Sequence, residues 1–420
     1  MNIKIDFIAP PYSGHLNPLI ELALPLQNKN FDIRFITGTQ KIDLLKSLGF
    51  EAVPILPGQP DAMENISNTD KPVKSNFFLL LKQLKENLAL IPTLKQELEV
   101  LLKDNHTDLV VADFVAVPAG MVCEEMSIPW ITTIPTPFAI ETRMGTPSYL
   151  GGLRYGKSWS HKIRNAVGRR MVHAFKQAVQ FLCRDELEHL NYRIYREDGT
   201  ERAYSSQSIL GLGIEEFEFE RDWPSSFRFI GACCCSPEPS IDLKMPFHEY
   251  NQSVLVSLGT HLEWAKQKLV NDVQFLAARF PEVLFVVSYG RPHHRSSEWV
   301  YRDHNVVAFE YVPYSQYLDQ FDAVIHHGGC GITYNCIQYL KPCLVIPHDY
   351  DQFDYAARIE YHNIGIRTTK IRSNQAIKSL RDILQDNRKE ELSAFNRCMQ
   401  KYNPPDELEK EIYRMLGVHR

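Results

Sequence analysis

Two separate regions of the chain alternate short runs of β-branched and aliphatic residues with longer amphipathic stretches. In the first region the predicted strands are 3–9, 31–37, 107–114 and 128–135. In the second region they are 253–260, 283–290, 305–312, 323–329 and 342–348, and a helix is predicted over 264–280. Strands that alternate with helices are typical of a parallel sheet covered on both faces, so the restart of the pattern predicts two such sheets.

The 420 residues exceed what one ordinary core accommodates, which agrees with two domains. We expect a fold of class α/β: one Rossmann-like domain over 1–225, a linker over 226–250, a second over 251–395, and a terminal helix over 396–420 that crosses back to the first domain. The linker is placed where prolines accumulate and periodicity stops. Because such sheets bind ligands beyond the carboxyl ends of their strands, two facing domains with an interdomain cleft suit a two-substrate reaction.

The composition argues against several classes of protein. Apolar residues make up 44% and charged residues 23% of the chain, as in ordinary globular proteins, and the net charge of -5 gives no reason to expect nucleic acid. No window approaches the roughly 18 apolar residues of a membrane span, and Asp6 interrupts the first apolar run, so we expect no signal peptide. The nine cysteines include no CxxC pair and are interpreted as reduced thiols in a cytoplasmic protein.

One segment, residues 326–352, combines histidines, a glycine turn and a carboxylate-amide pair. A buried strand ends at His326 and His327, and a turn with Gly328, Gly329 and Gly331 opens a helix from about Thr333. The N-terminus of a helix binds phosphate through free N–H groups, and glycine lets the backbone approach the anion closely. The alternative is a glycine loop that serves packing, with histidines that satisfy buried backbone groups.

Side chains around this turn extend the prediction to a nucleotide sugar. His327 can donate a hydrogen bond to the same anion, and Thr333 can cap the helix or contact phosphate. Asp351 and Gln352 follow the next strand, where sugar hydroxyls need an acceptor and a donor. The segment therefore predicts a nucleotide-sugar donor site.

Residues 326–360 resemble the donor signature of the family 1 glycosyltransferases, the UDP-glycosyltransferase superfamily that includes bacterial natural-product and macrolide-type enzymes. Residues 9–26 and 254–260 are similar to that family's N-terminal loop and helix and to its first C-domain strand, and 310–318 to the segment that stacks on the base. The resemblance covers most of the chain and is weakest over residues 60–100 and 140–250. It implies the GT-B architecture, with the acceptor in the first domain and the donor in the second.

The resemblance also implies roles for individual residues. His327 and the Gly328–Gly331 loop would hold the diphosphate, with Ser257 and Thr260 beside it; Tyr311 and the Val312 backbone would face the base; Asp351 and Gln352 would bind sugar hydroxyls. Three positions depart from the pattern: Ile332 replaces a serine or threonine, Asn335 replaces a glutamate, and Tyr311 replaces a tryptophan. These departures leave the nucleotide open between UDP, TDP and GDP, and we favour a UDP-sugar.

His15 and Asp113 are the candidate catalytic pair. His15 lies on the loop after the first predicted strand, and Asp113 ends another buried strand. Inverting transfer needs a base that takes the acceptor proton, and a histidine whose other ring nitrogen meets a carboxylate suits that task. The resemblance implies the same pairing. The alternatives are a histidine that caps the helix from about Asn17, and an acidic residue at a strand end.

Residues 142–184 contain no acidic side chain but carry nine lysines and arginines among apolar residues. A basic helix with an apolar face can lie on an anionic membrane, or it can receive a lipophilic or acidic acceptor. A solvated face that covers the acceptor pocket is the alternative. We therefore expect a cytoplasmic protein whose segment 142–184 is a candidate for peripheral contact with the inner face of the membrane.

The leading hypothesis is an inverting hexosyltransferase. It would move a hexose from a UDP- or TDP-sugar to a hydroxyl of a small hydrophobic acceptor such as a secondary metabolite, with no cofactor and no metal, because the Asp351 region is interpreted as a sugar contact. The alternatives are a nucleotide-sugar 2-epimerase, a NAD-dependent oxidoreductase and a non-catalytic partner protein on the same scaffold. The oxidoreductase lacks support because no GxGxxG follows the first strand.

Overall fold

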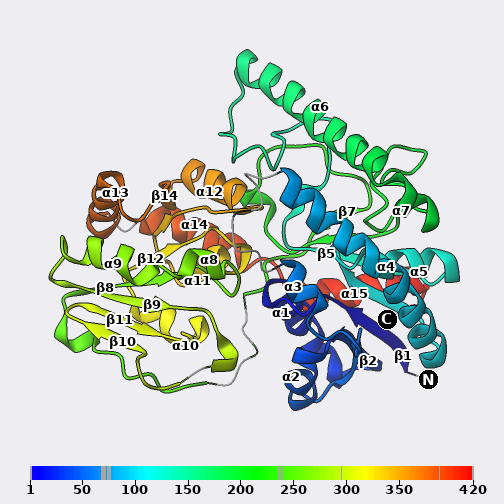
Figure 1. Cartoon of the computed structure of the whole chain (residues 1–420), viewed down its shortest axis with the longest axis horizontal. Coiled ribbons are helices and arrows are strands. Elements are labelled where there is room, and N and C mark those ends of the chain that lie inside the picture. Colours follow the sequence, from blue (N-terminus) through cyan, green and yellow to red (C-terminus); the bar gives the residue numbers. More distant parts are fainter. Residues whose placement is uncertain are drawn as a thin grey trace.

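The computed structural model of the chain describes residues 2–67, 72, 77–234, 237, 240–294, 296–386 and 388–418. It contains two sheets of seven strands each, and helices cover both of them (Figure 1). The predicted GT-B class, with two facing doubly wound domains, is confirmed. The first sheet is built from residues 3–229 and the second from residues 252–367.

The first sheet has the strand order β3-β2-β1-β4-β5-β6-β7, and all of its neighbouring strands are parallel. Its strands are β1 (Ile3–Ile8), β2 (Phe31–Gly38), β3 (Glu51–Ile55), β4 (Leu109–Asp113), β5 (Trp130–Ile134), β6 (Ile209–Gly211) and β7 (Phe227–Phe229). Its helices are α1 (Ser13–Ala23), α2 (Ile42–Ser47), α3 (Ala62–Ser67), α4 (Phe77–Asn105), α5 (Val117–Met126), α6 (Trp159–Leu182) and α7 (Arg184–His189).

The second sheet has the order β10-β11-β9-β8-β12-β13-β14, and only the β10–β11 pair is antiparallel. Its strands are β8 (Gln252–Ser257), β9 (Val283–Ser288), β10 (Tyr301–Asp303), β11 (Val306–Phe309), β12 (Ala323–His326), β13 (Cys343–Val345) and β14 (Gly365–Arg367). Its helices are α8 (Glu263–Lys266), α9 (Leu269–Ala277), α10 (Tyr314–Tyr317), α11 (Cys330–Gln338), α12 (Gln352–Tyr361), α13 (Asn374–Gln385) and α14 (Lys389–Met399).

Each sheet reverses its direction of growth once, and these switch points determine where loops gather. In the first sheet the chain grows from β1 through β2 to β3 and then returns to β4 on the other side of β1. In the second sheet it grows outward from β8 and then returns to β12 on the other side of β8. The loops at a switch point diverge to opposite faces of the sheet and leave a crevice beyond the strand ends.

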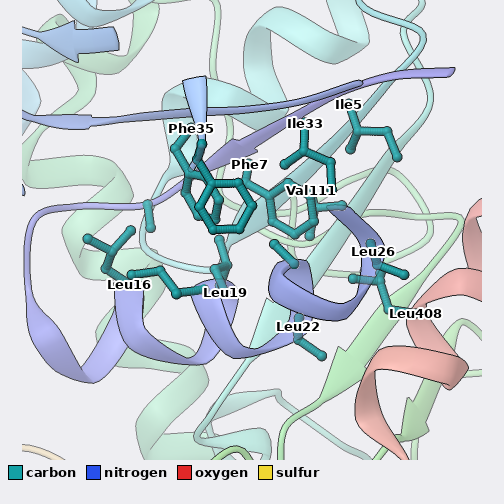
Figure 2. Packing of buried hydrophobic residues seen from close by; sticks show 14 of the residues in the cluster. Ile5, Phe7, Leu16, Leu19, Leu22, Leu26, Ile33, Phe35, Val111 and Leu408 are labelled. Carbon is teal, nitrogen blue, oxygen red and sulfur yellow. The ribbon is translucent and has the colours of Figure 1, made fainter. Parts of the chain in front are cut away.

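The terminal helix α15 (Pro404–Leu416) packs on the first domain, as predicted. Leu408 lies beside Leu26 in the same apolar cluster as Phe7 and Phe35 of the first sheet (Figure 2). Ion pairs reinforce the contact, with the Lys29 ammonium 2.5 Å from a Glu409 carboxylate oxygen. The preceding helix α14 packs instead against α11 of the second domain, so the chain crosses between the domains a second time just before α15.

A buried ion pair joins the domains at their boundary. Arg358, on α12 of the second domain, donates from Nε and Nη2 to Glu218 Oε2 at 3.0 and 2.7 Å. Glu218 precedes β7 in the first domain, and both side chains are at most 2% exposed. The guanidinium carbon also lies 4.1 and 4.5 Å from the ring centres of Phe138 and Phe219. The cation is therefore held by a carboxylate and by two aromatic faces.

Three helices differ from their predicted bounds. Helix α1 begins at Ser13 and includes the stretch that was predicted as a loop, and α11 begins at Cys330 rather than near Thr333. Gly14, Pro18 and Gly331 disfavour helix in isolation, but packing on the sheets overrides that local preference. The helix predicted over 264–280 is divided into α8 and α9.

None of the helices in the described ranges is long and apolar enough to cross a bilayer.

We expect Glu218→Ala to lower the free energy of unfolding by about 3–5 kcal/mol, because it leaves the Arg358 cation buried without its carboxylate. Chemical denaturation followed by tryptophan fluorescence measures the loss. Glu298→Ala is the matched control, since it removes an exposed pair with Lys244 and should leave the midpoint almost unchanged. Equal effects of the two substitutions would contradict the role given to the buried pair.

Candidate active site

A cavity of about 590 Å³ lies between the carboxyl ends of the two sheets. Loops after β1 and β4 form one wall, and loops after β8, β12 and β13 form the other. Both switch points therefore open into the same space. Of the predicted site residues, the cavity is lined by His15, Thr260, Tyr311, His327, Gly329, Gly331, Asp351 and Gln352.

The structure brings His15 and Asp113 together. His15 lies in the first turn of α1, and its Nδ1 is 3.0 Å from Asp113 Oδ1 at the end of β4. The same oxygen accepts the Val115 N–H at 3.0 Å, which fixes the carboxylate. Asp113 is 2% exposed, whereas a quarter of the His15 side chain is exposed. The ring therefore has one nitrogen on a buried carboxylate and faces the cavity.

Two titratable groups on opposite walls influence each other. Burial alone would lower the pKa of His15, but the charge and hydrogen bond of Asp113, with a contribution from Asp351, raise it above its usual 6.5. Burial raises the pKa of Asp351 to about 6, although its backbone hydrogen bond and His15 act in the opposite direction. His15 belongs to the first domain and Asp351 to the second, so they oppose each other across the interdomain space.

The glycine turn after β12 is shaped by close contacts. Gly328 has a φ of 93°, and a Cβ there would lie 2.8 Å from the carbonyl oxygen of Gln352. A Cβ on Gly259 or on Gly329 would lie 2.8 Å from Cε1 or 2.5 Å from Nε2 of the His327 ring. The glycines at these positions allow the Gln352 segment and the His327 ring to approach the backbone. Gly328 thus serves packing, which was the alternative interpretation for the turn.

Gly331 has the opposite environment. It lies in the first turn of α11, and a Cβ there would meet no atom within 4 Å. Gly329 is the N-cap of this nine-residue helix and provides no side-chain hydrogen bond. Cys330, Gly331 and Ile332 of the first turn all line the cavity. The positive end of a helix therefore faces the cavity with its first N–H groups uncapped by a side chain.

His327 stands beside this helix end in its neutral form. Burial, followed by the charges of His326 and His348, depresses its pKa well below the usual 6.5. Its Nδ1 is buried and makes no hydrogen bond to any residue that the structure describes. A neutral imidazole offers one donor and one acceptor, so it can bind an anion only through a single N–H.

Three of the predicted donor-site residues are buried and hydrogen-bonded within the protein. Thr333 is fully buried and donates from Oγ1 to the Gly329 carbonyl at 2.7 Å, so its hydroxyl is turned into its own helix. Ser257 lies under the wall, where its hydroxyl is 2.8 Å from the Tyr314 hydroxyl. Val312 is buried, and its N–H donates to Ser288 Oγ at 3.1 Å rather than toward the cavity.

The loop after β13 presents the carboxylate-amide pair. Asp351 is the N-cap of α12, and Gln352 uses its amide oxygen to accept the N–H groups of His348 and Asp349 at 2.8 and 3.1 Å. Only the NH₂ group of Gln352 therefore remains for a ligand. Asn335 also lines the cavity, and its Oδ1 is buried without a hydrogen-bond partner in the described part of the chain.

Sequence reasoning overlooked several lining residues. His261 directly follows Thr260, and its ring centre is 5.2 Å from that of Tyr12. Burial, followed by the charge of His15, lowers the pKa of His261 to about 4. The one sequence signal that could have located His261 is its position, because it follows a strand at a switch point. Tyr149 and Trp264 line the cavity too, and no motif marked them.

Within the described ranges, no group of three histidine, cysteine, aspartate or glutamate side chains is arranged to hold a metal ion. Asp349 and Asp351 both line the cavity.

Comparison with known proteins agrees with this geometry. Residues 293–414 match the family model described as "Erythromycin biosynthesis protein CIII-like, C-terminal domain". Over 383 residues the chain is 22% identical to the zeaxanthin glucosyltransferase of Pantoea ananas, covering 90% of this chain and 87% of that protein. The match thus extends through both domains.

Solved structures share the architecture over nearly the whole chain. The glycosyltransferase of kitacinnamycin superposes with a TM-score of 0.70 at 20% identity, covering 99% of this chain and 100% of that one. The spinosyn rhamnosyltransferase SpnG, solved with thymidine diphosphate, gives 0.66 at 17% identity, covering 98% and 100%. These relatives are transferases, and nothing in them favours the epimerase, the oxidoreductase or the non-catalytic partner. The chain has the GT-B fold and is similar, along nearly its whole length, to glycosyltransferases that act on natural products.

Proposed function

We propose that the protein transfers a hexose, with inversion, from a nucleoside diphosphate sugar to a hydroxyl of a small apolar acceptor. The observation that carries the proposal is the pairing of two features across one cavity. His15, held by Asp113, faces the cavity from the first domain, and the uncapped N-terminus of α11 faces it from the second. One feature suits a base for the acceptor, and the other suits the anionic leaving group.

The donor diphosphate would bind at the α11 N-terminus. The first-turn N–H groups and the dipole of the helix stabilise negative charge, and the neutral His327 adds one N–H donor. Negative charge on the leaving diphosphate grows during transfer, so fixed donors at this place would lower the barrier. Because these backbone groups supply the stabilisation, we propose that the reaction needs no metal and no cofactor. Retention of turnover in the presence of EDTA tests this point.

The sugar would lie between the diphosphate and His15. Asp351 can accept hydroxyl hydrogen bonds, and the Gln352 NH₂ group can donate one. The nucleoside would extend past Asn335 toward Tyr311, where Asn335 Oδ1 can accept a ribose hydroxyl. We favour UDP- or TDP-sugars as donors, and the thymidine diphosphate bound to the spinosyn enzyme supports the second.

The acceptor would enter from the first domain. Phe114, Val115 and Ile66 give that wall an apolar character, and Tyr12 and Tyr149 add aromatic rings with polar tips. One of the similar proteins is named as a glucosyltransferase for zeaxanthin, and we propose an apolar acceptor for this wall as well. His15 would remove the acceptor proton while the oxygen attacks the anomeric carbon and the diphosphate departs from the opposite side.

Binding and chemistry can be separated by one substitution. UDP or TDP should raise the melting temperature of the wild type and of His15→Ala equally, because His15 lies outside the diphosphate site. Turnover in a mass-spectrometric screen of donors and acceptors should fall about 10²- to 10⁴-fold in His15→Ala, the usual contribution of a general base. Loss of the thermal shift in the variant, or unchanged turnover, would contradict the assignment.

The helix N-terminus can be tested with two glycines. Gly331→Ala places a methyl group in open space at the cavity wall, so the fold should be as stable as wild type or more so, while UDP or TDP binding weakens at least 10-fold. Gly328→Ala is the contrast: its Cβ clashes with the Gln352 backbone at a positive φ, and it should destabilise the apo protein. Isothermal titration and thermal melts measure both quantities. Undiminished diphosphate binding in Gly331→Ala would remove the site from this helix.

The pH profile should report the His15–Asp113 contact. His15 acts as a base only when neutral, so the rate should rise with pH through a pKa above 6.5. Asp113→Asn removes the charge that raises this pKa and leaves burial, which lowers it. The acidic limb should therefore move to lower pH, while the maximum rate falls by no more than the about 10²- to 10⁴-fold that a base contributes. An unshifted limb would assign the titration to another group.

A further inference from the structure

Helix α6 presents an apolar stripe to solvent. It is 24 residues long, or about 36 Å at 1.5 Å per residue, and it lies along the top edge of the molecule in Figure 1. Large apolar side chains recur on its outer side over the whole length. This outer stripe consists of Trp159, Ile163, Val167, Met171, Phe175, Phe181 and Leu182, which are 42 to 77% exposed. The four-residue spacing of its first five members places them on one side of the helix.

The inner side of α6 is the polar one. Asn165 Nδ2 donates to Thr146 Oγ1 at 3.3 Å, and Arg169 Nη1 donates to the Gly145 carbonyl at 2.6 Å. His173 Nδ1 lies 3.0 Å from a Glu141 carboxylate oxygen. These contacts fix the rotation of the helix about its axis. The apolar stripe is therefore held outward. A surface helix of a globular protein normally turns its apolar side to the core and its polar side to solvent.

The surroundings of the outer stripe are basic. Residues 142–184 contain no aspartate or glutamate. Lys162 and Arg170 are exposed beside the stripe and form no ion pair with any residue in the described ranges. Lys176 of the same helix is paired with Glu141 and Glu201. The helix thus combines a row of apolar side chains with two unpaired cations.

We propose that α6 docks on the surface of an anionic lipid bilayer, with its axis in the membrane plane and the outer stripe in the headgroup region. An amphipathic helix with basic flanks binds in this way, through burial of its apolar side and attraction to acidic lipids. Trp159 and Phe181, near the two ends of α6, supply the aromatic rings that favour this interface.

A second copy of the chain is the less suitable occupant. A symmetric contact centred on the middle of α6 would bring Arg170 of both copies together, and the segment 142–184 offers no carboxylate to neutralise it. A bilayer that contains acidic lipids offers an apolar interior to the stripe and negative charge to the cations.

Docking would place the wall of the cavity at the membrane. A small cavity is lined by Arg169 and Val172 of α6 together with the loop 137–149, and Tyr149 of that loop also lines the main cavity. An apolar acceptor dissolved in the bilayer would then reach the proposed site beside α6. Membrane binding itself rests on α6 alone and does not depend on the proposed transfer reaction.

Flotation of the full-length protein with phosphatidylcholine vesicles, with and without 30% phosphatidylglycerol (about one lipid in three), tests the proposal. Protein should float with the anionic vesicles, and less of it should float at high salt. The double variant Val167→Glu with Met171→Glu should bind these vesicles at least 10-fold more weakly. The charge variant Lys162→Gln with Arg170→Gln should also lose about 10-fold or more, since each cation near the surface contributes to attraction.

Matched controls add the same charge changes elsewhere. Val300→Glu with Val418→Glu introduces two carboxylates at side chains of similar exposure outside α6, 48 and 46%. Lys268→Gln with Arg397→Gln removes two exposed cations on the second domain. Both controls should bind anionic vesicles like wild type. Thermal melts of all variants, which should match wild type, ensure that lost flotation reflects the surface and not unfolding.

Three results would overturn the proposal. The first is the absence of flotation with anionic vesicles, which would leave the stripe to a protein partner. The second is equal loss of flotation in the control and α6 variants. The third is a dimer in light scattering of the wild type that becomes a monomer in Val167→Glu with Met171→Glu, because the stripe would then be a contact between copies.

Discussion

The buried contact between Arg358 and Glu218 holds the two domains in the relation that creates the cavity. A guanidinium taken out of water is costly unless its charge and its N–H groups are satisfied, and here the partners come from the other domain. Neighbouring contacts follow the same pattern. The Tyr355 hydroxyl and the Cys330 thiol of the second domain both donate to the Pro135 carbonyl of the first, at 2.6 and 3.3 Å. The position of the α11 N-terminus opposite His15 depends on this boundary.

Much of the fold follows from the sequence because long parallel strands are buried on both faces. β4, β9 and β11 are near-continuous runs of apolar residues, and such runs indicate a covered parallel sheet. The three-residue strands β6, β7, β10 and β14 are too short to show a period, so residues alone did not reveal them. The outward apolar stripe of α6 was also beyond reach, since periodicity shows that a helix has an apolar side but not which way that side faces.

Some residues of the candidate site could likewise be located from the sequence, and others could not. Residues that end strands at the switch points, such as Asp113 and His327, could be located from the strand pattern and the order of elements. Side-chain direction within a turn could not, because Thr333 points along its own helix while Gly331, two residues earlier, stands at the cavity. His261 escaped notice because a single histidine after a strand carries no spacing signal. The catalytic and binding roles themselves remain predictions that the experiments above address.

The two crossings of the chain between the domains limit how the domains can move. One passes between β7 and β8, and the other lies between α14 on the second domain and α15 on the first. Bodies tethered at two points retain one easy motion, a rotation about the line through the tethers, whereas sliding or twisting would stretch one connection. Such a hinge would widen or narrow the space between the two sheets, and the same strand ends would still face each other. Such a rotation would keep the two walls aligned, and the buried Arg358–Glu218 contact would have to adjust to it.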